Sequence, residues 1–185
     1  MTEIRYLLDS NIFIEASRKY YHFEICPDFW SALIEQHHAG RVFSIDRVKQ
    51  ELTTGSLNDD GSERDNLALW GKDAVPKSFF ASCNDLVVIQ SYKEIIQSVN
   101  DNPQYFSSAK EEFANVADSW LIAYAKAHGM VVVTHKNNSS TARKRVLMPV
   151  ICMEFDIPVV TLFEMLLEMK IQFVRKPIAA GKKGK

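Results

Sequence analysis

Short apolar runs alternate with segments of helical periodicity along this chain, and the alternation predicts its fold class. Five runs rich in aliphatic residues are predicted strands: 4–8, 41–45, 86–89, 130–134 and 159–160. Segments with apolar residues three or four apart are predicted helices: 29–38, 46–52, 92–99, 115–128 and 162–169. Strands that alternate with helices pair in parallel through right-handed crossovers, so the sequence predicts an α/β sandwich.

The length of the chain and the lack of a break in it predict one domain. The chain has 185 residues, and domains usually run to roughly 100–200 residues. We find no internal repeat and no Pro- or Gly-rich linker between the predicted elements. The prediction is a single domain over residues 1–174, followed by a basic, flexible tail over residues 175–185.

Composition and charge exclude some classes of protein and leave others open. Charged residues make up 24% of the chain, and no apolar run approaches the roughly 18 residues of a membrane span, so a membrane protein is excluded. The first residues lack the pattern of a signal peptide, which predicts a cytoplasmic protein. Three widely spaced cysteines fit neither a disulfide framework nor a zinc site. The 22 Lys+Arg nearly balance the 23 Asp+Glu, but Arg143, Lys144 and Arg145 form a cluster that is either a solvated surface or a contact for phosphates.

Three carboxylates interrupt apolar patterns and are candidates for chemistry. Asp9 follows an apolar run, at a strand end where ligands of parallel sheets bind, although an Asp there is also a common helix N-cap. Glu51 lies at the border of a helical core face and could equally be a surface residue. Asp118 has mostly apolar neighbours three and four residues away, so it is either a buried functional group or the N-cap of a helix that begins at Ser119.

Taken together, these carboxylates predict a metal site. Asp9, Glu51 and Asp118 would converge on one crevice beyond the strand ends. Carboxylate oxygens without His or Cys favour Mg²⁺ or Mn²⁺ over zinc. Such an ion orients water and neutralises charge on a phosphodiester, so the predicted chemistry is phosphodiester hydrolysis.

Four motifs in order resemble the PIN-domain family of metal-dependent ribonucleases. They cover roughly residues 4–165, and each motif alone is weakly specific. Their sequences are Leu-Asp-Ser-Asn-Ile-Phe-Ile at 8–14, Val-Lys-Gln-Glu-Leu at 48–52, Ala-Asp-Ser-Trp-Leu-Ile-Ala at 117–123, and Val-Val-Thr at 132–134. The resemblance implies a three-layer α/β/α sandwich with a central parallel sheet, an acidic pocket for Mg²⁺ or Mn²⁺, and an RNA substrate.

The resemblance also implies roles for residues and partners. Asp9, Glu51 and Asp118 would be the catalytic metal ligands, with Ser10, Asn11 and Thr134 supporting them. Many small prokaryotic members are toxins of toxin–antitoxin pairs, so the resemblance implies an antitoxin protein that blocks the acidic crevice. Homodimers are common in the family, and a homodimer is therefore a further expectation.

One position departs from the family pattern. A fourth Asp or Glu commonly follows the strand-ending Thr by two residues, and Lys136 stands there in this chain. Lys136, together with residues 143–145, would bind the RNA backbone. The same lysine would equally suit a degenerate PIN-like module that binds RNA or protein without cleavage.

Three further interpretations concern Asp9, His135 and a group of aromatic residues. A phosphatase that uses Asp9 as its nucleophile would need a second acid two residues on, where Asn11 stands, so this reading is poor. His135 follows a predicted strand and is expected to be an exposed loop residue rather than a general base. Tyr20, Tyr21 and Trp30 could belong to a partner surface, although core packing is the expectation for Trp30.

Overall fold

The computed structural model describes residues 3–54, 66–135 and 143–173. Its five strands are β1 (Tyr6–Leu8), β2 (Val42–Ile45), β3 (Phe80–Ala81), β4 (Val131–Val133) and β5 (Val159–Val160). They form one sheet in the order β3-β2-β1-β4-β5. Every pair is parallel, with Leu7 opposite both Phe43 and Val132. The predicted parallel sheet is confirmed.

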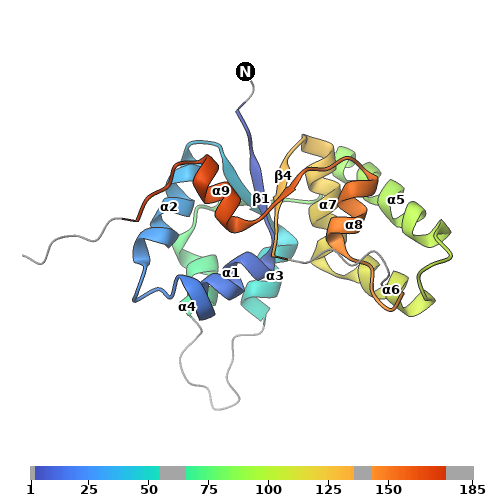
Figure 1. Ribbon diagram of the computed structural model, residues 1–185, viewed down its shortest axis with the longest axis horizontal. Helices are drawn as coiled ribbons and strands as arrows, with labels where there is room; N and C mark the ends of the chain where they lie inside the picture. The colour runs from blue at the N-terminus through green and yellow to red at the C-terminus, as the bar shows by residue number, and fades with distance from the viewer. Residues whose placement is uncertain (1–2, 55–65, 136–142, 174–185) are drawn as a thin grey trace, which may run out of the picture.

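Helices cover both faces of this sheet, as the three-layer sandwich requires. The α-helices are α1 (Ser10–Glu15), α2 (Pro27–His38), α3 (Asp46–Thr54), α4 (Asn66–Leu69), α5 (Leu86–Asp101), α6 (Ser107–Asn115), α7 (Ala117–His128), α8 (Met148–Glu154) and α9 (Leu162–Glu168). Shorter helical turns are η1 (Ala16–Tyr20), η2 (Trp70–Ala74) and η3 (Lys77–Phe79). Figure 1 shows α1, α2, α4 and α9 on one side of β1 and β4, and α5 to α8 on the other. The predicted α/β/α sandwich is therefore confirmed.

The core lies on both sides of the two central strands. All three residues of β1 are buried, as are Val132 and Val133 of β4. Phe13, Phe29, Trp30, Phe79 and Trp70 fill one side with rings that contact one another. Trp30 is thus a core residue, as expected, and it donates a hydrogen bond from Nε1 to the carbonyl oxygen of Tyr21.

The predicted third strand is wrong. Residues 86–89 open helix α5 instead, because the Asp85 side chain accepts a hydrogen bond from the backbone N–H of Val87 and caps the helix. Leu86 and Val87 are exposed, so only part of this apolar run reaches the core. The third strand of the structure is instead the short β3, which is not among the strands predicted from the sequence.

Smaller differences concern the long helix predicted over 115–128 and the ends of the chain. Val116 has an extended backbone, so α7 begins at Ala117, and Asn115 is the last residue of the preceding helix α6. The predicted tail and most of the polar connection after α3 lie outside the described residues. In the described ranges, no helix is both long enough and apolar enough to span a membrane.

Candidate functional site

The order of the strands places a crevice between the ends of β1 and β4. From β1 the chain builds the sheet outward through β2 and β3, and then returns to the other side of β1 to add β4 and β5. At such a topological switch point the connections leave in opposite directions, and ligands of parallel sheets bind beyond the carboxyl ends of the strands. Asp9 follows β1 here, and Thr134 follows β4.

The side chain of Asp9 is a buried carboxylate that connects the end of β1 to the end of β4 through a hydrogen bond. Only 1% of the residue is exposed. Its Oδ2 accepts hydrogen bonds from Thr134 Oγ1 at 2.9 Å and from Asn11 Nδ2 at 3.1 Å, and its Oδ1 accepts one from Ser10 Oγ at 3.3 Å. Asp9 is the N-cap residue of α1 by position, but its side chain makes no capping bond. The carboxylate is therefore oriented by Ser10, Asn11 and Thr134 rather than used to cap a helix.

Asp118 lies in the first turn of α7, next to the same crevice. The helix begins at Ala117 and its N-cap is Val116, so the alternative in which Asp118 caps a helix starting at Ser119 is wrong. A carboxylate in a first helical turn is favoured by the partial positive charge of the helix N-terminus. Asp118 is half-buried rather than fully packed.

A pocket of about 330 Å³ opens beyond the ends of β1 and β4. Four segments contribute side chains to it: α1, the start of α7, the residue after Thr134, and the segment that leads into α8. The described lining residues are Asn11, Glu15, Asp118, His135, Arg145, Val146, Leu147 and Met148. Asn11 thus contacts the Asp9 carboxylate and also lines the pocket that Asp118 lines.

Glu51 reaches the N-terminus of α7 from α3. It is exposed, and its Oε1 accepts a hydrogen bond from the backbone N–H of Ala117 at 3.3 Å. This contact satisfies one of the free N–H groups at the start of the helix. Glu51 therefore lies close to Asp118 along α7, but it is not among the described residues that line the pocket.

The donors suit a hard cation in type, but they do not form a closed cage. Among the described residues, no three His, Cys, Asp or Glu side chains are grouped so that they could hold a metal ion. Mg²⁺ commonly keeps several waters and binds one or two carboxylates together with substrate phosphates. Asp118 lines the pocket, whereas Asp9 is connected to it through Asn11 and Glu51 through the start of α7. The metal site on Asp9, Glu51 and Asp118 stays a prediction.

The pocket also contains a His–carboxylate pair that sequence reasoning missed. The His135 side chain is 17% exposed and its Nε2 lies 3.9 Å from Glu15 Oε2, so the expectation of an exposed loop residue is wrong. Glu15 follows Asn11 by four residues on α1, which places both side chains on one face of that helix. That spacing could have identified Glu15 from the sequence.

The predicted RNA-binding residues have different positions. Arg145 is exposed and lines the pocket. Arg143 and Lys144 are exposed next to it, and the backbone oxygen of Arg143 accepts a hydrogen bond from the N–H of Phe106. Lys136, the residue that departs from the PIN pattern, lies outside the described residues.

The sequence of the chain matches a known family over most of its length. The profile of a family described as a domain of unknown function, DUF4411, matches residues 6–173, which include every strand of the sheet and every described residue of the pocket. The chain belongs to the DUF4411 family. No curated protein matches this DUF4411 chain in sequence.

Among solved structures, this DUF4411 protein is similar to FitAcB from Neisseria gonorrhoeae. The two share 20% sequence identity with a TM-score of 0.49, and the match covers 83% of this chain and 95% of the other. A similarity of this extent carries no argument about function.

Proposed function

We propose that this DUF4411 protein is a metal-dependent nuclease that hydrolyses RNA phosphodiester bonds in the pocket beyond β1 and β4. The observation that carries the proposal is the position of two carboxylates at the topological switch point: buried Asp9, oriented by three side-chain donors, and Asp118, on the wall of the pocket. The order of motifs that resembles PIN domains supports the choice of RNA as substrate.

The residues in and around the pocket would have different roles in this reaction. Asp9 and Asp118 would hold Mg²⁺ or Mn²⁺, which supplies a water of lowered pKa and neutralises charge on the phosphodiester. Asn11 holds the Asp9 carboxylate in place through its Nδ2. Arg145 presents a guanidinium to the pocket, and its planar set of N–H donors suits phosphate oxygens. Glu51 would act indirectly, because its bond to Ala117 fixes the start of the helix that carries Asp118.

A cleavage assay tests the proposal. The full chain is incubated with a mixed set of single-stranded and structured RNAs in Mn²⁺, in Mg²⁺ and in excess EDTA. We expect cleavage in the presence of either metal and none in EDTA. A well-folded chain that cleaves no RNA with any metal would overturn the proposal.

A second candidate function is a degenerate PIN-like module that binds RNA or protein without cleaving it. The observation that favours it is the lack of a three-carboxylate group among residues 3–54, 66–135 and 143–173. The two functions predict different responses to metal, because an ion that binds only the folded state stabilises that state. The stabilisation is RT ln(1 + [L]/Kd), where [L] is the free metal concentration, and it reaches about 2.7 kcal/mol when [L] is 100 times Kd. Mn²⁺ should raise the unfolding temperature of a nuclease and leave that of a degenerate module unchanged.

The toxin role belongs to the same proposal and depends on the PIN resemblance. A toxin would stop growth when expressed alone, and an antitoxin that covers the pocket would relieve the arrest. The expected test is induced expression of the wild-type chain and of Asp118→Asn in one host. Growth arrest by both proteins would separate toxicity from the pocket and contradict this part of the proposal. The expected homodimer stays a prediction.

A further inference from the structure

Two exposed aromatic rings lie beside the pocket on elements far apart in the sequence. Tyr20 ends η1 and Phe163 lies in the first turn of α9. Their ring centroids are 6.0 Å apart, with an angle of 78° between the ring planes. Tyr20 is 50% exposed and Phe163 is 47% exposed. Part of each π surface is therefore open to a ligand, although the edge-to-face contact holds the rings in a fixed relation.

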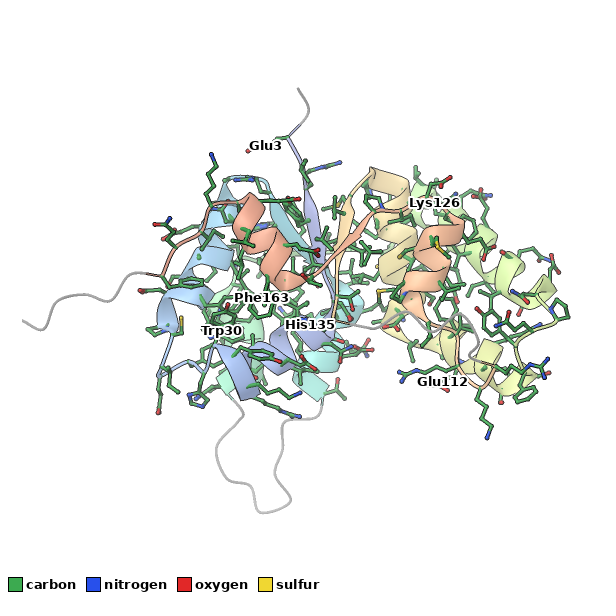
Figure 2. All side chains as sticks on the ribbon, in the orientation of Figure 1. Glu3, Trp30, Glu112, Lys126, His135 and Phe163 are labelled. Atoms are coloured by element: carbon green, nitrogen blue, oxygen red, sulfur yellow. The ribbon has the colours of Figure 1, made fainter. Side chains whose placement is uncertain are left out.

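His135 connects these rings to the pocket. Its ring centroid lies 6.3 Å from that of Tyr20 and 6.4 Å from that of Phe163. The same histidine lines the pocket together with Arg145 and Asp118. Figure 2 shows Phe163 and His135 near each other at the lower end of the sheet. A ligand that fills the pocket can therefore extend onto the two rings.

We propose that Tyr20 and Phe163 form a stacking platform for one unpaired base of a single-stranded RNA whose backbone lies in the pocket. This inference rests on the proposed nuclease function and specifies the form of its substrate. Exposed aromatic side chains next to cationic groups bind single strands, because each base offers a π face once it leaves the base-paired stack. A base inside a duplex has no such free face, so the platform selects single strands.

Charge and position favour RNA over a protein ligand. Arg145 on the pocket wall, with Arg143 and Lys144 beside it, supplies positive charge for a phosphate backbone. The platform continues into that pocket through His135 rather than lying on a separate face. Leu167, one turn beyond Phe163 on α9, is 76% exposed and provides an apolar residue on the same helix for comparison.

The test is a binding titration with a stacking-sensitive probe. The full chain is titrated, in EDTA to prevent cleavage, into a short single-stranded RNA that carries one 2-aminopurine, whose fluorescence falls when it stacks. The variants are Tyr20→Leu and Phe163→Leu, which keep an apolar side chain and remove the ring. Leu167→Ala is the matched control, and Tyr20→Phe keeps the ring.

We expect the wild-type chain to quench the probe, and each Leu variant to bind at least about fivefold more weakly with less quenching. Leu167→Ala and Tyr20→Phe should bind like the wild type, and a duplex of the same sequence should bind equally to all five proteins. Unchanged RNA binding by both Leu variants would overturn the platform and leave the rings as a protein-contact surface. An absence of binding by the wild type would overturn it as well.

These outcomes are separate from those of the nuclease proposal. Cleavage by the wild-type chain together with unchanged binding by the Leu variants would leave the nuclease standing and remove the platform. Stacking of the probe by a chain that cleaves no RNA would support the platform and contradict the nuclease, because a degenerate module could keep the base-binding surface.

Discussion

Asp9 shows how a charged group is retained in the core of this protein. Burial of an unpaired carboxylate costs several kcal/mol, and hydrogen bonds to the charged form offset that cost. Three side chains donate such bonds, and one of the donors, Thr134, directly follows the neighbouring strand β4. The bond between Thr134 and Asp9 therefore stabilises the fold and also orients the carboxylate.

Replacement of Thr134 by Val should destabilise the protein. The change keeps the shape of the side chain and removes the hydroxyl that donates to Asp9 Oδ2 at 2.9 Å. Hydrogen bonds to charged groups contribute about 1.5–3 kcal/mol, so we expect the free energy of unfolding to fall by about 2 kcal/mol. Urea denaturation measures this, with Thr134→Ser as the variant that keeps the hydroxyl. A Val variant as stable as the wild type would contradict this role of the bond.

Local patterns in the sequence indicate candidate site residues, but they do not indicate the contacts that these residues make. Asp9 and Asp118 were recognisable because each interrupts an apolar pattern at an element boundary. The bond from Ala117 to Glu51 and the approach of His135 to Glu15 join residues that are 66 and 120 positions apart. No local pattern encodes such contacts, because they arise when the helices pack around the sheet.

Helix α5 shows why short apolar runs mislead at the scale of elements. Residues 86–89 read as a strand from composition, but the buried positions of the segment are Val88, Ser91, Ile95 and Val99, which have helical spacing. The N-cap bond to Asp85 and the helical spacing over sixteen residues determine the outcome. A four-residue run is too short to distinguish the two periodicities.

Replacement of Asp85 by Ala should test that interpretation. Asp85 Oδ1 accepts a hydrogen bond from Val87 N at 3.1 Å, and loss of a cap of this kind costs about 1 kcal/mol. We expect a lower urea midpoint for Asp85→Ala, with Asp85→Ser close to the wild type because serine also caps helices. Equal stability of Asp85→Ala and the wild type would show that the cap contributes nothing.

A buried tyrosine connects β1 to the last helix. Tyr6 donates a hydrogen bond to the Glu168 carboxylate on α9. Burial, reinforced by that hydrogen bond and the negative charge of Glu168, raises the pKa of Tyr6 to about 12. A raised pKa in the folded state means that this contribution to stability is complete below the ordinary pKa of about 10 and is lost as the pH rises through about 12.

Tyrosinate absorbance near 295 nm measures this effect. Burial also raises the pKa of Tyr21, Tyr92, Tyr105 and Tyr124, but Tyr6 is raised furthest. In the folded wild type Tyr6 should therefore be the last tyrosine to ionise, and Tyr6→Phe should lack the step at the highest pH. If the step at the highest pH persists in Tyr6→Phe, the highest of these pKa values belongs to a different tyrosine.

For the molecule as a whole, the strand order explains why the candidate residues meet. The sequence predicted parallel strands and a site at a strand end, and both follow from local patterns. It did not predict that β1 lies between β2 and β4, since strand order depends on contacts between distant segments. That order creates the switch point at which Asp118 and Arg145 line one pocket, with Asp9 connected to it through Asn11.

The most direct test of a nuclease site in this pocket compares two neighbouring acids. Asp118 lines the pocket. Glu112 on α6 is exposed and is not among the described residues that line this pocket, although it lines a second, small cavity together with Asp118 and Arg145. Figure 2 marks the position of Glu112. Single-turnover cleavage of RNA in Mn²⁺ is measured for the wild type, Asp118→Asn and Glu112→Gln, after urea denaturation has shown that all three are folded.

The expected result is a rate for Asp118→Asn that is lower than that of the wild type by about two orders of magnitude or more, with Glu112→Gln close to the wild type. That pattern would place the hydrolysis at the pocket beyond β1 and β4. Equal cleavage by folded Asp118→Asn and the wild type would contradict the central claim.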